Sequence, residues 1–153
     1  MPWYTSHMIN LVQIVVLTGA AGVLAYVGNT LAFRRMGCRS TLTVVPWWEE
    51  GCKFAAITLL PGHPLFTVHM VFGLAEFTHD LWRDQCDGLF LPLLTLIGHG
   101  LFGSLAVLAA NTLGHYGWAY PVTAVAHSLF SAAVVFAVLP TLGAGPFLRA
   151  GRR

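Results

Sequence analysis

The chain has 153 residues, of which 56% are hydrophobic and only 9% are Asp, Glu, Lys or Arg. About a quarter of the residues in an ordinary soluble domain are charged, so this composition excludes a soluble globular domain. The formal charge is only +2, and the eight Lys and Arg residues do not gather into one basic face, which argues against nucleic-acid binding.

Hydropathy and helix breakers together predict about five transmembrane helices. A helix needs about 20 apolar residues to cross the hydrocarbon core of a bilayer. Three runs reach this length: Met8 to Phe33, Leu89 to Ala110 and Trp118 to Leu139. The region between the first two is divided by Pro61-Gly62-His63-Pro64, which should stop a helix. We therefore expect two further helices, Thr41 to Leu60 and Pro64 to Trp82, and one all-α membrane domain over residues 1–153.

The arginines predict the orientation of this bundle. One cluster follows the first apolar run and another follows the last: Arg34, Arg35 and Arg39, then Arg149, Arg152 and Arg153. Positive residues concentrate on the cytoplasmic side, so both clusters should lie there, with an even number of crossings between them. The expected topology has five crossings, with the amino terminus outside and the carboxyl terminus in the cytoplasm.

The cysteines point to no disulfide or metal framework. Cys38, Cys52 and Cys86 are odd in number and lack C-x-x-C spacing. We expect all three to be free thiols.

Ionisable residues inside the predicted helices need an explanation, because a charge at membrane depth costs several kcal/mol by insertion scales. Lys53 follows Glu49 by four residues and Glu50 by three, so either carboxylate can pair with it on one helix face. On the next helix, a 3.6-residue period places Glu76 on one stripe with three other positions, namely His69, Phe72 and either His79 or Asp80.

Two histidines lie near the middle of the last two predicted helices, His99 in the fourth and His127 in the fifth. Taken singly, either can be explained by an interhelical hydrogen bond. If they converge with the glutamates, a carboxylate can take a proton from water while an imidazole orients the water and stabilises an oxyanion. That chemistry is amide hydrolysis.

These residues resemble the motifs of the PrsW-type intramembrane proteases, which are related to CAAX prenyl proteases and bacteriocin-processing proteins. The first motif, E-E-x-x-K, corresponds to Glu49 through Lys53, and the second, F-x-x-x-E, to Phe72 through Glu76. Histidines in successive later helices correspond to His99 and His127. The CAAX branch would instead show E-E-x-x-x-R and F-x-x-x-H. The resemblance covers Pro46 to about Ser131.

The resemblance implies an intramembrane endopeptidase of a prokaryotic cytoplasmic membrane, acting on membrane-protein or peptide substrates. Glu49 or Glu50 would be the general base, and Lys53 would tune this carboxylate pair. Three further residues would position water and stabilise the oxyanion: Glu76, His99 and His127. Gly103 and Ser131 depart from the family pattern, which often has Asn or Asp four residues after the histidine. A short, degenerate and inactive member is therefore an open alternative.

Cofactor use is also open, between no cofactor and a divalent metal such as zinc. A metal would be held by Glu76, His99 and His127, although H-E-x-x-H is absent. A di-iron site built on Glu76-x-x-His79 would need a second such motif, and the sequence has none. Two alternatives from other classes of protein are also open. One is an accessory subunit in which His99 and His127 ligate a haem or pigment, and the other is a purely structural subunit of a larger membrane complex.

Overall fold

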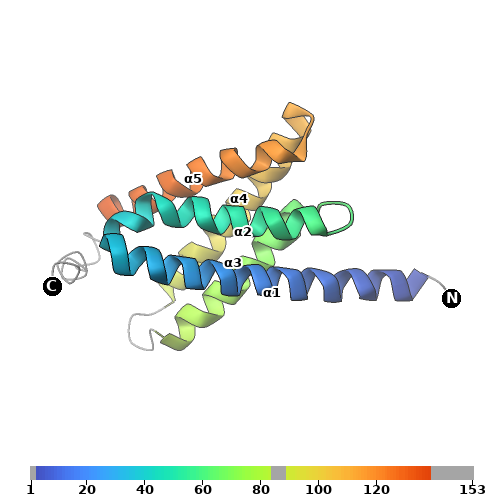
Figure 1. Ribbon diagram of the computed structural model, residues 1–153, viewed down its shortest axis with the longest axis horizontal. Helices are drawn as coiled ribbons and strands as arrows, with labels where there is room; N and C mark the ends of the chain where they lie inside the picture. Colours follow the sequence, from blue (N-terminus) through green and yellow to red (C-terminus); the bar gives the residue numbers. More distant parts are fainter. Residues whose placement is uncertain (1–2, 84–88, 139–153) are drawn as a thin grey trace.

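The computed structural model describes residues 3–83 and 89–138, and these form a helical bundle (Figure 1). In chain order the helices are α1 (Trp3–Met36), α2 (Val44–Leu59), α3 (Leu65–Arg83), α4 (Phe90–Leu113) and α5 (Ala119–Ala133). Within these residues no β-strand occurs, so the all-α prediction is confirmed.

Glycines with positive φ lie at the ends of the helices. Gly62 has φ 71°, inside the predicted Pro-Gly break, and α2 and α3 end and begin on either side of it. Gly114, with φ 73°, is the C-cap of α4. A residue in this left-handed region cannot continue an α-helix, and glycine adopts it without a steric penalty. The predicted helix break between α2 and α3 is confirmed.

The helix limits differ from the predicted ones by a few residues. Helix α1 extends beyond its apolar run at both ends, and α2 begins at Val44 because Gly37–Leu42 forms a 3₁₀ helix. Helix α5 is α-helical only to Ala133 and continues as a π-helical turn, Val134–Val138. Hydropathy marks the apolar part of a helix, whereas the hydrogen-bonded helix propagates into its polar ends.

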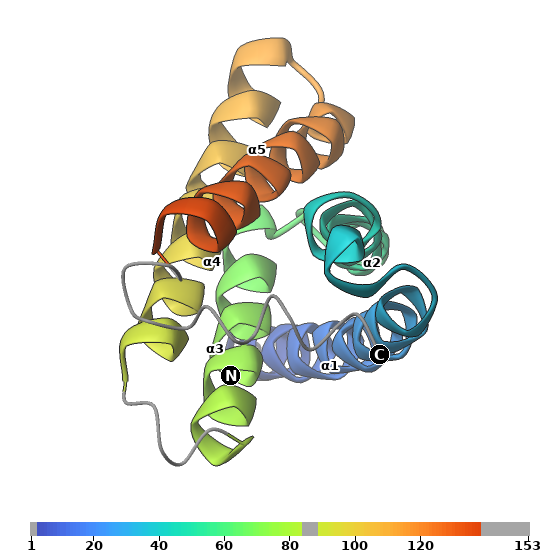
Figure 2. The same cartoon turned by 90° about the vertical axis from the view of Figure 1, so that its left-hand side faces the viewer.

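Helices α1, α2 and α5 lie side by side, while α3 and α4 cross them obliquely (Figures 1 and 2). The most extensive contact joins α3 to α4, and α2 packs against α1, α5 and α3. The two turns that connect α2 to α3 and α4 to α5 lie at the same end of the bundle, because the ring of His63 stacks on that of Tyr116 with centroids 4.1 Å apart. Successive helices therefore run up and down.

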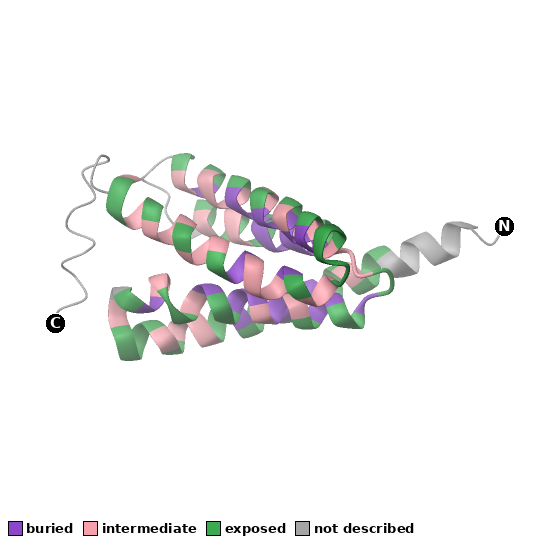
Figure 3. Cartoon of the chain, turned by 90° about the horizontal axis from the view of Figure 1, so that it is seen from above, coloured by how far each residue is buried: buried purple, intermediate pink, exposed green. Residues whose placement is uncertain are grey.

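The bundle buries charged and polar side chains beside its apolar core and exposes large apolar side chains on its outside. Its most deeply buried side chains include Lys53, Glu50 and His69, whereas large apolar residues such as Val23 and Leu129 are exposed. Figure 3 shows the buried positions turned toward the interior of the bundle and the exposed ones on its outside. In a water-soluble domain, charged residues are almost never fully buried unless paired, and extensive exposed apolar surface is rare. Three segments are long and apolar enough to cross a membrane: Leu11–Met36, Phe90–Leu113 and Tyr116–Val138. These features indicate integration into a membrane.

Some predictions fall outside the described residues. The arginines near the carboxyl terminus, Arg149, Arg152 and Arg153, belong to this part of the chain, as does Cys86. The predicted orientation in the membrane therefore stays a prediction. For Cys52, which is buried and unpaired, the free-thiol prediction is confirmed.

Candidate active site

Helix α2 directs its three charged side chains into the bundle. Glu49, Glu50 and Lys53 are buried, whereas Trp47 and Trp48, which immediately precede them in the sequence, are exposed. The i to i+3 and i to i+4 spacing places the amine and the carboxylates on one face of the helix. That face lies against α1, α3 and α5.

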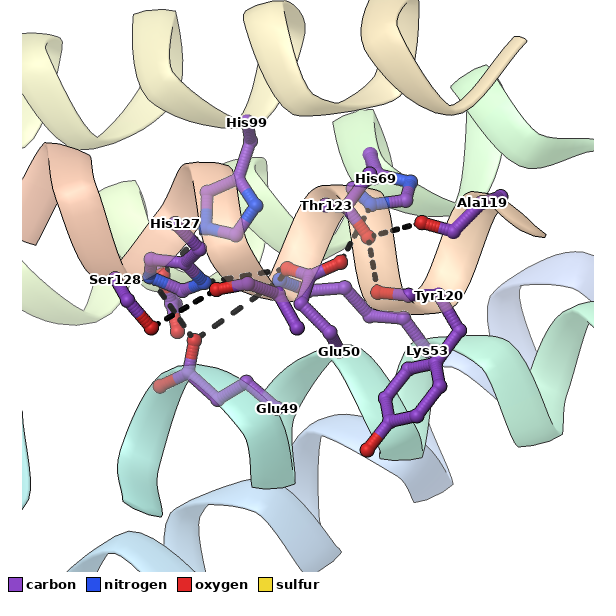
Figure 4. Close-up of polar contacts among 12 residues, drawn as sticks. Glu49, Glu50, Lys53, His69, His99, Ala119, Tyr120, Thr123, His127 and Ser128 are labelled. Carbon is purple, nitrogen blue, oxygen red and sulfur yellow. Dashed lines mark hydrogen bonds and ion pairs between the residues drawn. The ribbon is translucent and has the colours of Figure 1, made fainter. Parts of the chain in front are cut away.

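Glu50 lies at the centre of the cluster and joins three helices (Figure 4). Its Oε1 accepts a hydrogen bond from Nζ of Lys53 at 2.7 Å and lies 3.2 Å from Nδ1 of His127 on α5. Its Oε2 lies 2.9 Å from Nε2 of His69 on α3. Both carboxylate oxygens of Glu50 are therefore engaged.

The second ring nitrogen of His69 constrains where a proton lies. Nδ1 of His69 is 2.8 Å from the carbonyl oxygen of Leu65, which can only accept, so Nδ1 carries a hydrogen. Nε2 then either donates to an ionised Glu50 from a doubly protonated imidazole or accepts from a protonated Glu50. In both states His69 and Glu50 share one proton.

Glu49 has a different environment from its neighbour. Its Oε1 accepts a hydrogen bond from the side-chain amide of Asn29 on α1. Its Oε2 lies 3.9 Å from Nζ of Lys53 and 3.8 Å from Nε2 of His127, both beyond hydrogen-bond length. Within the described residues, Oε2 makes no hydrogen bond, so Glu49 retains an oxygen that can accept one.

Glu76 and His99 form a second carboxylate–imidazole pair, between α3 and α4. Oε2 of Glu76 is 2.7 Å from Nε2 of His99. The Glu76 side chain is 32% exposed, whereas that of His99 is only 3% exposed. Nδ1 of His99 is buried without a partner among the residues described. The rings of His99 and His127 lie 6.3 Å apart, so this pair adjoins the cluster around Glu50.

The rings of Phe72 and Phe102 contact the charged groups and imidazoles of the site. Nζ of Lys53 lies 4.5 Å from the centroid of the Phe72 ring, a cation–π contact that helps to hold the amine at Glu50. The same ring lies 5.6 Å from His99. Phe102 on α4 stacks on His127 with centroids 4.8 Å apart. The structure therefore places Phe72, the first residue of the F-x-x-x-E motif, between the two halves of the site.

The residues of the sequence motifs all lie in this one region, namely Glu49, Glu50, Lys53, Phe72, Glu76, His99 and His127. Two further residues of the site, His69 and Asn29, were not predicted as site residues. The sequence placed His69 only on the helical stripe that includes Phe72 and Glu76. That shared helix face is the feature that could have identified His69 as a site residue. Asn29 interrupts the apolar sequence of α1 as an amide at membrane depth, a signal of the same kind. Gly103, which departs from the family pattern, packs on His69: a Cβ there would lie 3.1 Å from Cβ of His69.

The candidate metal ligands do not form a preformed metal site. In residues 3–83 and 89–138, no three His, Cys, Asp or Glu side chains are arranged to hold one ion. The predicted set was Glu76, His99 and His127, and in it Nε2 of His99 is hydrogen-bonded to Glu76. The nitrogens of His127 face Glu49 and Glu50. The arrangement favours imidazole–carboxylate pairing over ligation of zinc or of a haem.

The fold and the site together define a class of protein. It is a helical bundle with three candidate membrane spans that buries a group of carboxylates, imidazoles and one amine. No match was found to this chain among protein-family models, curated proteins or solved structures. Membership of the PrsW-type family therefore stays a proposal.

Proposed function

We propose that this protein is a glutamate-dependent intramembrane endopeptidase of the PrsW type. The observation that carries the proposal is the 3.8 Å separation of Oε2 of Glu49 from Nε2 of His127, between two groups that can both accept a proton. A water molecule about 2.8 Å from each atom would contact both at once. The two side chains would then bind and orient the attacking water.

Glu49 is the general base in this proposal, and Glu50 is a positioning residue. The oxygens of Glu50 already face Lys53, His69 and His127, which leaves little capacity to accept a proton from water. Glu49 is held through one oxygen by Asn29 and keeps the other for the water. Glu50 fixes the orientation of His127, whose Nδ1 it contacts.

The pair of Glu76 and His99 stabilises the oxyanion. When Glu76 is protonated and donates to Nε2 of a neutral His99, the imidazole carries its hydrogen on Nδ1, the atom without a partner among the described residues. In the reaction, Glu49 takes a proton from water and the resulting hydroxide adds to the scissile carbonyl. The Nδ1–H of His99 donates to the oxyanion. The proton on Glu49 then passes to the leaving amine as the C–N bond breaks.

The setting is a prokaryotic cytoplasmic membrane, which the chain crosses five times with its amino terminus outside. The alternation of helix direction supports this topology, as does the inward burial of the charges on α2. Lipid surrounds the apolar faces, and the substrate is a membrane protein or peptide. The site uses water without a resident cofactor.

The proposal is tested by cleavage of a library of transmembrane peptides in liposomes, with products identified by mass spectrometry. Glu49→Gln is isosteric and removes the base, so we expect at least about a hundredfold loss of rate. Thr58→Val is the matched control, because Thr58 lies exposed on the same helix and bonds only to the carbonyl of Ala55. If the wild-type and control proteins are folded and cleave nothing, the chain is an inactive subunit.

A further inference from the structure

A groove of about 620 Å³ lies between α1 and α3, bordered on α4 by Thr95. Its α1 wall is lined by small residues, including Gly19, Gly22 and Ala25. A Cβ at Gly19 would meet nothing within 4 Å, and one at Gly22 would only touch the Phe72 ring at 3.9 Å. These glycines face open space, in contrast to glycines that allow two helices to approach closely.

Two buried polar atoms on this wall have no partner within the described residues: Oγ1 of Thr18 and Oδ1 of Asn29. Threonine in a helix commonly donates to the carbonyl four residues earlier, as Thr30 and Thr78 do here. Thr18 does not, although it is only 2% exposed. Buried polar groups are nearly always hydrogen-bonded, so each atom needs a partner that the described residues do not supply.

The spacing of these atoms sets the length of the ligand. Thr18 and Asn29 are separated by eleven residues of α1, or about 16 Å at 1.5 Å per residue. About five residues of extended peptide cover the same distance at 3.3 Å each. A ligand that bonds to both atoms therefore runs along α1.

The chemistry of the two atoms selects the kind of ligand. Oδ1 of Asn29 accepts only, so its partner must carry an N–H or O–H group. A lipid acyl chain has neither, and an intact helix has already used its backbone groups internally. An extended peptide offers unpaired N–H and C=O groups together with apolar side chains, which suit the apolar wall.

One end of the groove reaches the proposed catalytic centre. Asn29 donates to Glu49 through its amide nitrogen, and Asn29 is itself one of the residues that line the groove. Glu76 also lines the groove. The ring of Tyr26 lies 5.9 Å from that of His79, so this end of α1 adjoins the end of α3 that carries Glu76.

We propose that the groove between α1 and α3 binds an extended, mainly apolar peptide segment of the substrate. Its backbone N–H donates to Oδ1 of Asn29, and a backbone carbonyl about four residues away accepts from Oγ1 of Thr18. This inference rests on the proposed function and names the substrate conformation, a locally unwound segment that enters beside α1.

The test is photocrosslinking to the full-length protein in liposomes. The probe is a capped octapeptide of valine and alanine with one central benzophenone residue. We expect crosslinks on α1 and α3, mapped by mass spectrometry and competed by the unlabelled peptide. An analogue N-methylated at every residue lacks the N–H donors and should compete at least about tenfold less well.

Two variants, Gly22→Leu and Thr18→Val, test peptide binding in the groove separately from the stability of the fold. Gly22→Leu fills the groove and should reduce crosslinking at least about tenfold, whereas Val16→Leu, on an exposed part of α1 outside it, should not. Thr18→Val removes only the hydroxyl, so it should weaken peptide binding while the melting temperature is unchanged or rises. Equal labelling by a benzophenone fatty acid, or equal competition by the N-methylated analogue, would overturn the proposal in favour of a lipid site.

The crosslinking and cleavage results can fail separately. If the peptide crosslinks in the groove and no substrate is cleaved, the endopeptidase proposal fails and the binding site stands. If cleavage is observed and Gly22→Leu leaves both crosslinking and cleavage unchanged, the groove proposal fails and the endopeptidase proposal stands.

Discussion

Gly73 of α3 lies directly against His99 of α4, so close that a Cβ on the glycine would be 2.6 Å from Cβ of the histidine. The relationship is reciprocal, because Gly103 of α4 faces His69 of α3. Each histidine precedes the glycine of its own helix by four residues. This repeated H-x-x-x-G pattern on two antiparallel helices brings His69 to Glu50 and His99 to Glu76.

We predict that Gly73→Ala will destabilise the bundle by about 1–3 kcal/mol, because the added methyl group forces α3 and α4 apart. The measurement is unfolding in mixed micelles, followed by tryptophan fluorescence. Gly19→Ala is the matched control, since its methyl group enters open space and should leave stability unchanged or slightly higher. Equal stability of the two variants would contradict the close contact.

Lys53→Met should lower the free energy of unfolding by about 3–5 kcal/mol, because it leaves the buried carboxylate of Glu50 without its cation. Adding Glu50→Gln should recover part of this loss, and a double-mutant cycle measures the coupling. Arg35→Met, which removes an exposed cation from α1, should change stability by less than about 0.5 kcal/mol. Additive effects of the Lys53 and Glu50 substitutions would show that the ion pair is absent.

His69→Phe should reduce peptide cleavage by about 10- to 100-fold while the protein stays folded. The phenyl ring keeps the packing against Gly103 but cannot contact Oε2 of Glu50, so Glu50 and His127 lose their fixed orientation. A positioning role predicts that kcat falls more than KM rises, and that the pH profile of kcat changes. His63→Asn is the control: His63 lies outside the cluster, and asparagine tolerates its φ of 45°. An unchanged kcat in His69→Phe would exclude this role.

Cys52 should react with a membrane-permeant maleimide only after the bundle unfolds, since its side chain is buried on α2 against α1. The experiment uses the double variant Cys38→Ser/Cys86→Ser, so that mass spectrometry reports one thiol. Rapid labelling of the folded protein would mean that the interface between α1 and α2 opens.

Reporter fusions test the five-crossing topology. Alkaline phosphatase fused after Pro64, in the turn between α2 and α3, should be active, because the predicted orientation places that turn outside. Green fluorescent protein fused to the carboxyl terminus should fluoresce, as expected for a cytoplasmic end. An inactive phosphatase fusion at Pro64 would mean that the orientation is opposite to the predicted one or that the chain crosses the membrane fewer than five times.

The sequence predicted the helices better than the network of the site. Apolar length and the Pro-Gly break located all five helices, because both signals are local in the chain. Contacts across helices are not local: the spacing of Glu49, Glu50 and Lys53 allowed either ion pair on α2. The closer pair, Glu50 with Lys53, depends on His69, His127 and Asn29 from three other helices. No periodicity within α2 contains that information.

The inward charges of α2 also constrain how the protein is made. Lys53 pairs with Glu50 within α2, but the two carboxylates find their other partners on α1, α3 and α5, so the isolated segment would enter lipid with an unbalanced negative charge, at a cost of several kcal/mol. Helices α3 and α5 are synthesised after it. We therefore expect α2 to wait beside α1 in the insertion machinery and to move into the bilayer together with the helices that follow.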